Sequence, residues 1–301
     1  MNRIRMAAVL VALGMIWGLT IPLTKIVVST GHQPLGLIFW QLLIATVALS
    51  AISVIRRVGP VLNRRALIYF LVVGLLGTIF PNSFSYLAAA HLPAGVMGIV
   101  IASVPMFSLG IALGLRFERP SFQRGVGVLL GAGAVVLLIG PQTSLPDPGK
   151  AIFVLVALIA PLCYGAEGHY IAARAPQDVD PVMTLLGASA IGCLIAGPLA
   201  LASGSWVDVF TPWGNAEWAL LLSSLCHVVA YTGYVWLVGM TGAVFASQMA
   251  YVVTVSAILL SALLLSEIYS AWVWSALALM MAGLTLVQPR GARQPEPEIS
   301  G

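Results

Sequence analysis

Charged residues are scarce in this chain. They make up 8% of its 301 residues, with 14 Lys and Arg against 10 Asp and Glu, whereas apolar residues make up 60%. A soluble domain carries about a quarter of its residues as charged side chains. A chain with so few cannot cover its surface with water, and its mean hydropathy of +1.01 agrees. These values exclude a soluble domain and predict an all-α integral membrane protein.

Cysteine and catalytic motifs are also scarce. Cys163, Cys193 and Cys226 all fall inside apolar runs, so no disulfide framework is expected. Cys226 adjoins His227, but neighbours on a helix point about 100° apart, so we predict no metal site. The chain has no P-loop, no HExxH helix and no Asp inside an apolar run. We therefore expect neither an enzyme nor a cofactor, although a Ser–His enzyme using His227 stays open.

The chain contains ten apolar runs instead. Each has close to the ~20 residues that a helix needs to cross a ~30 Å hydrocarbon core. The first run follows MNRIR without a clear cleavage site, so we interpret it as a span and not as a signal peptide. The runs cover residues 6–29, 35–55, 66–89, 94–115, 122–140, 151–173, 181–204, 214–238, 242–265 and 269–288.

The positive charges predict the orientation of these spans. If the N-terminus is inside, twelve arginines fall on the inner side and only Lys25 and Lys150 fall on the outer side. The positive-inside rule then places both termini in the cytoplasm. The net charge of +4 reflects this topology, so no nucleic-acid partner is expected. The polar tail, residues 290–301, is expected to be disordered.

The runs divide into two sets of five around the linker GPQTSLPDPGK. Because five is odd, the second set starts on the opposite side, which predicts two inverted repeats, 1–145 and 146–289. Two landmarks recur in the halves. Trp17 and Tyr164 each precede a glycine in the first and sixth runs, 147 positions apart. Glu118 and Glu267 close the fourth and ninth runs, 149 positions apart, and are expected to cap or orient loops.

With these landmarks the sequence resembles the drug/metabolite transporter superfamily, and more closely its EamA-type members. The resemblance extends from about residue 6 to residue 288. It implies a basket of ten helices around a central cavity, lined by spans one, three, four, six, eight and nine, with spans five and ten as scaffold. Family members commonly export amino acids or other small metabolites, and relatives carry nucleotide sugars or triose phosphates. Tyr164 departs from the pattern by replacing the Trp found at position 17.

Polar and aromatic side chains recur on single faces of several spans. In span eight Ser223, His227, Tyr231 and Tyr234 share one face. Such side chains are costly in a bilayer unless they face water or protein, so they line a cavity or bond between helices. We predict a cavity whose substrate-binding residues are Trp17, Thr20, Thr78, Asn82, Tyr164, Glu167, His227, Tyr231, Gln248 and Tyr251.

Two charges remain inside spans. Lys25 is close enough to the outer interface to snorkel there. Glu167 is the only carboxylate well within the membrane. Because desolvation favours the neutral form of a carboxylic acid, we predict that Glu167 couples transport to protons. The alternative is a protonated side chain that only bonds a neighbouring helix. His227 is the better candidate partner for Glu167, because His169 falls on another side of the same helix.

Small residues and prolines have mainly structural interpretations. Gly125, Gly127, Gly131 and Gly133 form a small-residue face in span five that suits helix packing or a dimer interface. Prolines interrupt spans one, three, four and six, as static kinks or as hinges. They are Pro22, Pro81, Pro105 and Pro161.

Together these features predict a secondary transporter of the inner membrane that exports an amino acid or a similar small metabolite. Its partners would be that small molecule, protons and the lipid bilayer, with the chain acting as a monomer or a homodimer. A multidrug or organic-cation transporter and a sugar-type metabolite transporter are the alternatives within the superfamily. A membrane receptor or structural protein is the alternative from another class, but it does not explain the paired polar stripes.

Overall fold

The computed structural model describes residues 3–210 and 212–287, and within these ranges every regular element is a helix. Eight helical segments are long and apolar enough to cross a membrane. Two shorter apolar helices, Met249–Leu265 and Ala271–Val287, complete a set of ten. The predicted all-helical fold is therefore confirmed. The tail that was expected to be disordered, residues 290–301, lies outside the described residues.

The ten segments are numbered here as spans one to ten. Spans one to five are α1 (Arg3–Val28), α2 (Pro34–Arg56), α3 (Arg64–Gly74) with η1 (Leu75–Ile79) and α4 (Phe80–His91), α5 (Ala94–Ile101) with α6 (Val104–Gly114), and α7 (Phe122–Ile139). After η2 (Pro148–Lys150), spans six to ten are α8 (Ile152–Ala157) with α9 (Ile159–Arg174), α10 (Pro181–Ala202), α11 (Asn215–Thr241), α12 (Ala243–Ala246) with α13 (Met249–Leu265), and α14 (Ala271–Val287).

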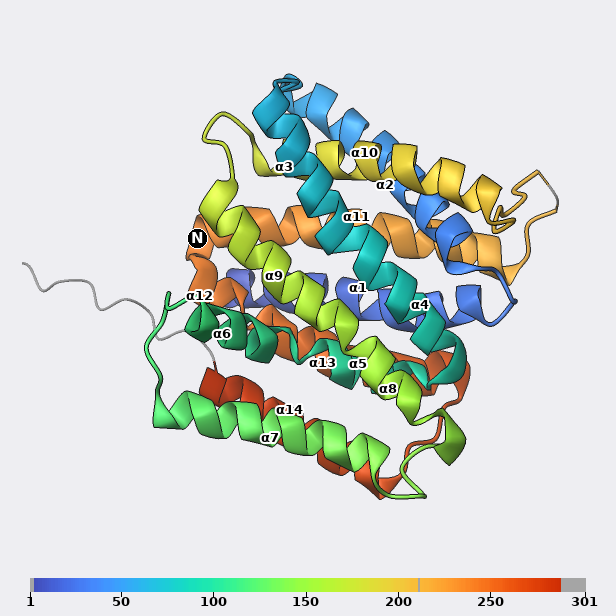
Figure 1. The fold of residues 1–301 in the computed structure, drawn as a ribbon, viewed down its shortest axis with the longest axis vertical. Coiled ribbons are helices and arrows are strands. Elements are labelled where there is room, and N and C mark those ends of the chain that lie inside the picture. The colour runs from blue at the N-terminus through green and yellow to red at the C-terminus, as the bar shows by residue number, and fades with distance from the viewer. Residues whose placement is uncertain (1–2, 211, 288–301) are drawn as a thin grey trace, which may run out of the picture.

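The two sets of five spans pack in the same way. The first span of the first half, α1, packs against α11 and α13 of the second half. Its counterpart in the second half, α9, lies against α4 and α6 (Figure 1). Further contacts join α2 to its own counterpart α10, α7 to α14, and α5 to α13, and the contact of α3 with α10 is matched by that of α11 with α2. Exchanging the halves leaves this set of neighbours unchanged, as an internal repeat requires. The limits 1–145 and 146–289 stay a prediction.

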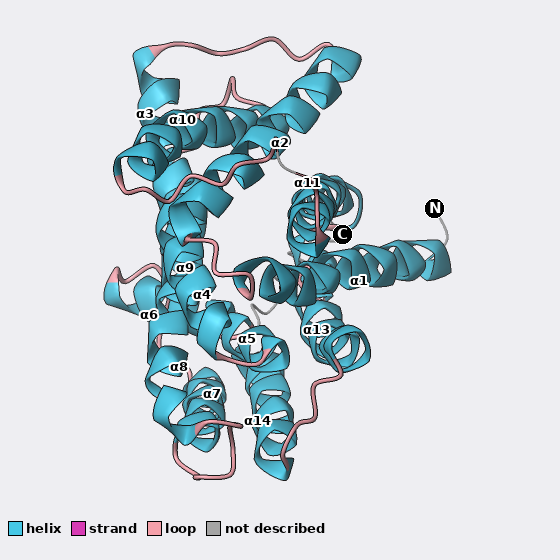
Figure 2. Cartoon of the chain, turned by 90° about the vertical axis from the view of Figure 1, so that its right-hand side faces the viewer, coloured by secondary structure: helices cyan, strands magenta, loops and turns pink. Residues whose placement is uncertain are grey.

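The helices are arranged with the fifth and tenth spans at one edge. Figure 2 shows α2, α3 and α10 on one side of the molecule and α7 with α14 on the other. Between them lie α1, α4, α5, α11 and α13. We call the end where α1 begins the arginine-rich end, because Arg56, Arg64, Arg124 and Arg174 lie there, in the first or last turn of α2, α3, α7 and α9. The opposite end carries Lys25 and Lys150.

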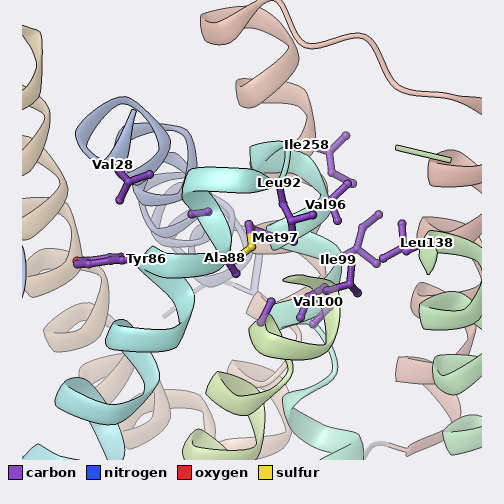
Figure 3. Packing of buried hydrophobic residues seen from close by; sticks show 14 of the residues in the cluster. Val28, Tyr86, Ala88, Leu92, Val96, Met97, Ile99, Val100, Leu138 and Ile258 are labelled. Carbon is purple, nitrogen blue, oxygen red and sulfur yellow. The ribbon is translucent and has the colours of Figure 1, made fainter. Parts of the chain in front are cut away.

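The core is centred on α5. All residues from Ala94 to Val100 are buried. Figure 3 shows the side chains of Val96, Met97, Ile99 and Val100, with Leu138 of α7 and Ile258 of α13 beside them. Because an apolar side chain gains little from leaving lipid for protein, close van der Waals packing holds such helices together. Gly98 makes this contact close, since a Cβ atom there would lie 2.9 Å from the Ala257 Cβ.

The glycines of α7 serve packing within the chain. A Cβ atom on Gly127 would lie 2.7 Å from Val287 Cγ2 and 2.9 Å from the Gly283 carbonyl oxygen of α14. A Cβ atom on Gly131 would overlap Met106 of α6. By contrast, Gly125 has open space in front of it. A Cβ atom on Gly133 would lie 3.9 Å from Leu279 Cδ1 of α14, so three of the four glycines face another span of the same chain, which supports the packing interpretation.

Three of the four span prolines coincide with breaks. Pro81 follows the π-helical turn η1, Pro105 lies in the first turn of α6, and Pro161 follows the break at Leu158. A proline removes a backbone donor and crowds the preceding turn, which explains these positions. Pro22 was expected to interrupt span one, but α1 runs without a break from Arg3 to Val28. This helix is held between α11 and α13, and that packing keeps it continuous.

Candidate functional site

Glu167 lies in α9 and faces the π-helical turn of span three. A Cβ atom on Gly77 of that turn would overlap the Glu167 carboxylate, so glycine leaves the room that the side chain occupies. Single π-helical turns are frequent at functional sites. Within residues 3–210 and 212–287, the carboxylate makes no hydrogen bond and no ion pair. The structure therefore leaves this acid free to take a proton or a cationic group.

Three tyrosines contribute to the electrostatic surroundings of this carboxylate. Tyr69, Tyr164 and Tyr231 all lie within electrostatic range of Glu167. They come from α3, α9 and α11, so spans three, six and eight meet at the acid. Aromatic faces attract cations, and the effect is larger where water is excluded. A carboxylate among tyrosines is a suitable setting for an ammonium group.

A hydrogen-bonded chain of side chains connects spans two, three and six. The Tyr164 hydroxyl donates to Asn82 Oδ1 at 3.2 Å, and Asn82 Nδ2 donates to Gln41 Oε1 at 3.0 Å. The Tyr86 hydroxyl donates to the same Gln41 oxygen. The structure thus brings together two predicted residues, Asn82 and Tyr164. The sequence prediction missed Gln41, although an amide inside an apolar run, FWQLL, is a signal in itself.

An aromatic cluster joins span one to span eight. The Trp17 ring packs edge-on against His227, Tyr231 and Tyr234, with centroids 5.6, 6.3 and 6.2 Å away. The predicted stripe of span eight therefore does face span one. His227 makes no described contact with Glu167, which was its predicted partner. Tyr231 of this cluster lies within electrostatic range of the acid.

The other predicted residues have more local roles. Thr20 Oγ1 donates to the Trp17 carbonyl at 2.6 Å within its own helix. Thr78 lies in η1, beside Gly77. Gln248 directly precedes α13, and Tyr251 packs against the main hydrophobic core. His169 contacts the Ser108 hydroxyl and carbonyl of α6 at 3.2 and 2.8 Å, on another side of α9 from Glu167.

At the opposite end, Glu267 fastens span nine to span four. Its two carboxylate oxygens accept from the backbone N–H groups of Ala94 and Gly95 at 2.8 and 3.2 Å, and from the Tyr269 hydroxyl at 2.6 Å. Burial and the bond to this carboxylate raise the pKa of Tyr269. A carboxylate at the N-terminus of α5 also suits the helix dipole. The expected capping role of Glu267 is thus found, but on a distant helix and not on its own loop.

Lys25 lies beside this fastening. Its ammonium donates to the Ala89 carbonyl at 2.6 Å, at the end of α4, and lies within electrostatic range of Glu267. Both side chains line a cavity of about 260 Å³ together with His91 and Asp147. The snorkelling alternative for Lys25 agrees with this position.

Glu118 occupies the corresponding place in the first half but has a different partner. It forms an ion pair with Arg124 at the start of α7. The two ends of the molecule are therefore fastened differently, although the sequence repeats the acid.

Among the described residues, His, Cys, Asp and Glu side chains gather nowhere in a group of three or more that could hold a metal.

The chain is similar to known transporters over most of its length. The model of the EamA-like transporter family matches it twice, over residues 5–140 and 151–288. An Escherichia coli (strain K12) protein named "Uncharacterized inner membrane transporter YedA" is 27% identical over 287 residues, which cover 92% of this chain and 89% of that protein. Proteins of the same name from the O6:H1 and O157:H7 strains align equally.

The fold also has a solved counterpart. A crystal structure matches with a TM-score of 0.59 over 95% of this chain and 98% of that chain. The two sequences are 19% identical, so this likeness shows the fold alone.

Proposed function

Because the chain belongs to the EamA-like transporter family, we propose that it is a secondary active transporter that exports an amino acid or a similar small metabolite in exchange for protons. The E. coli relative is named as an inner membrane transporter, which supports the same membrane for this chain. The arginine-rich end then faces the cytoplasm, in agreement with the positive-inside rule.

The observation that carries this proposal is the unpartnered carboxylate of Glu167. A bilayer-spanning protein retains an acidic side chain only at a cost, and such residues commonly mark substrate or proton pathways. This one has neither a basic partner nor a hydrogen bond within the described residues, so structural pairing does not account for it. A proton and a substrate ammonium group would compete for it, and that competition is antiport.

The surrounding residues have roles that follow from their positions. Trp17, Tyr164, Tyr231 and Tyr251 provide apolar and cation–π surface. Asn82, His227 and Gln248 provide hydrogen bonds, and Gln41 fixes Asn82 by accepting from its amide. Thr20 and Thr78 are smaller wall residues. Each group orients substrate, while Glu167 alone changes charge during the cycle.

Alternating access would open the two ends in turn. The contact of Glu267 with Ala94 and Gly95 closes the outer end, because it joins span nine to span four there. Glu118 makes no such bridge, since its partner is Arg124 of the adjoining α7. This asymmetry supports a conformation in which the Glu267 end is the closed one. Rocking one five-helix half against the other would open the end that the Glu267 contact closes and would close the opposite end.

A second candidate function is export of organic cations. The edge-on cluster of Trp17, Tyr231 and Tyr234 next to Glu167 suits a bulky amine as well as an amino acid. The two candidates differ in whether the substrate carries a carboxylate. A sugar phosphate is less suitable, because the candidate site contains no Lys or Arg to neutralise it.

The test uses purified protein in proteoliposomes, screened for uptake of amino acids, amines and sugars with and without a pH gradient. Glu167→Gln keeps the size and hydrogen bonding of the side chain but cannot titrate. We expect this variant to insert and unfold like the parent, to lose gradient-driven transport by at least tenfold, and to keep exchange of substrate for substrate.

The control is Glu118→Gln, which removes a carboxylate outside the candidate site. Its gradient-driven transport is expected to stay within about twofold of the parent, since a single solvated ion pair contributes little. Parent-like gradient-driven transport in Glu167→Gln would show that the acid is structural and would refute the proposal.

A further inference from the structure

A second cavity lies at the arginine-rich end, outside the site described above. It has a volume of about 620 Å³ and opens between the start of α3 and the end of α9. We call it the arginine cavity. It is lined by Arg64, Arg65, Ile68, Tyr69, Tyr170 and Arg174. Three exposed arginines thus line one open cavity whose volume would admit a small metabolite.

These arginines have no counter-charge of their own. The ion pairs in residues 3–210 and 212–287 join His32 to Glu217, Arg56 to Asp180, Arg124 to Glu118, and Lys150 to Asp147. None of them includes an arginine of the cavity. Like charges that share a cavity repel one another, whereas a bound anion would offset that repulsion. Arginine is also well suited to an anion, since its planar group binds carboxylate or phosphate in two places.

The local structure places two of these arginines at the start of α3. Asn63 Oδ1 accepts from the Ala66 N–H at 2.8 Å and caps α3, so Arg64 and Arg65 occupy its first turn. The positive end of the α3 dipole adds to their charge. Topology alone would explain arginines anywhere in these loops. It does not explain three around one cavity without a carboxylate partner.

Two tyrosines of the cavity lie between its arginines and the candidate transport site. The Tyr69 and Tyr170 rings are stacked, with centroids 5.9 Å apart and planes at 19°. Tyr69 is buried and lies within electrostatic range of Glu167. Tyr170 is one helical turn from Glu167 on α9. The arginines, the two aromatic rings and the carboxylate thus follow one another along α3 and α9.

We propose that the arginine cavity is an entry subsite that binds the carboxylate of the substrate before its ammonium group reaches Glu167. This inference rests on the proposed function and narrows it to zwitterionic substrates. An amine without a carboxylate is repelled by three guanidinium groups at the entrance. An anion without an amine is repelled by Glu167 further in. Only a molecule with both charges is attracted at both points.

The experiment measures the electrostatic potential in the cavity and whether a ligand occupies it. It does not require the substrate to be known. Ile68 lines the cavity and is 48% exposed, so Ile68→Cys, in a chain whose three cysteines are replaced by alanine, places a thiol there. Anionic and cationic methanethiosulfonate reagents of equal size are compared in nanodiscs. The anionic reagent is expected to react faster. Adding Arg174→Gln should lower the ratio of the two rates about tenfold, because a unit charge roughly 6 Å away in water changes each rate about threefold in opposite directions.

Arg124→Gln is the matched control, since it removes the same charge at the same end outside the cavity. It is expected to change the ratio less than twofold. Equal effects of Arg174→Gln and Arg124→Gln would show a general surface potential and would overturn the proposal. Thermal unfolding of each variant verifies that the fold is kept.

Occupancy is tested with small probes. Acetate and glycine should slow labelling of Ile68→Cys, glycinamide should not, and Arg174→Gln should abolish the protection. An anionic lipid presents the same charge, so the labelling is repeated in phosphatidylcholine nanodiscs with and without phosphatidylglycerol. Protection by phosphatidylglycerol that acetate and glycine do not reproduce would identify a lipid site and overturn the proposal. So would the absence of protection by any probe.

Failure of this inference is distinct from failure of the proposed function. Labelling does not require transport, so Glu167-dependent transport without carboxylate protection would remove only the entry subsite. Carboxylate protection in a protein whose transport ignores Glu167→Gln would remove only the proton-coupled mechanism.

Discussion

The contact between Glu267 and the start of α5 allows a quantitative prediction about the end opposite the arginine-rich end. Glu267→Gln removes the charge and leaves one oxygen to serve three donors, two backbone N–H groups and the Tyr269 hydroxyl. A hydrogen bond to a charged group contributes about 1.5 to 3 kcal/mol. Since Glu267 is only half-buried, we expect a loss of about 1 to 2 kcal/mol in the state closed at this end. The open population would rise about five- to thirtyfold.

The measurement uses the labelling rate of Val96→Cys by a membrane-impermeant thiol reagent. Val96 is fully buried in the first turns of α5, behind the Glu267 contact, so its rate reports opening. Tyr269→Phe removes one of the three donors and should give a smaller increase. Because the pKa of Tyr269 is raised, its contribution is fully present below the ordinary tyrosine value of about 10 and is lost as the pH rises through the raised value. Ionisation of Tyr269 should therefore cause no change in the labelling rate between pH 7 and 9.

Glu118→Gln is the comparison, because it changes the corresponding acid of the first half. That acid pairs with Arg124 and does not bridge spans four and nine, so labelling of Val96→Cys should stay within about twofold of the parent. An unchanged rate in a folded Glu267→Gln variant would show that the contact does not hold this end closed. Equal increases from both variants would show that any lost carboxylate loosens the bundle.

Two further predictions concern packing and topology. Gly127→Ala should destabilise the protein by about 1 to 3 kcal/mol in thermal unfolding, because the added methyl group meets α14. Gly125→Ala faces open space and should stabilise the protein by up to about 1 kcal/mol through helix propensity. Equal shifts in the two variants would contradict the packing of α7 on α14. A reporter inserted at Asp147 should be external and one fused after Arg293 cytoplasmic, and finding both on the same side of the membrane would contradict the inverted halves.

Much of the architecture was predictable because it depends on the average hydropathy of short stretches of the sequence. Hydropathy over about 20 residues decides whether a segment spans a membrane, whatever it packs against. The ten spans therefore agree with the described helices to within a few residues, and the recurring Trp17 and Tyr164 landmarks indicated the repeat. Faces with a 3.6-residue period were also readable, so His227, Tyr231 and Tyr234 do share one face of span eight. That this face meets Trp17 emerged only from the structure.

Partners across helices were not predictable in the same way. Gln41 was missed because it is alone in its span, and only the packing of span two against span three gives it Asn82. His227 was expected beside Glu167 but lies against Trp17, because the rotation of α11 is set by its contact with α1. The sequence determined the membrane class, the number of spans and the two halves, since these depend on residues close together along the chain. Only the tertiary structure decided that Glu267 would cap α5 and that Arg64 and Arg174 would share a cavity, because the relative rotation and depth of distant helices determine which side chains meet.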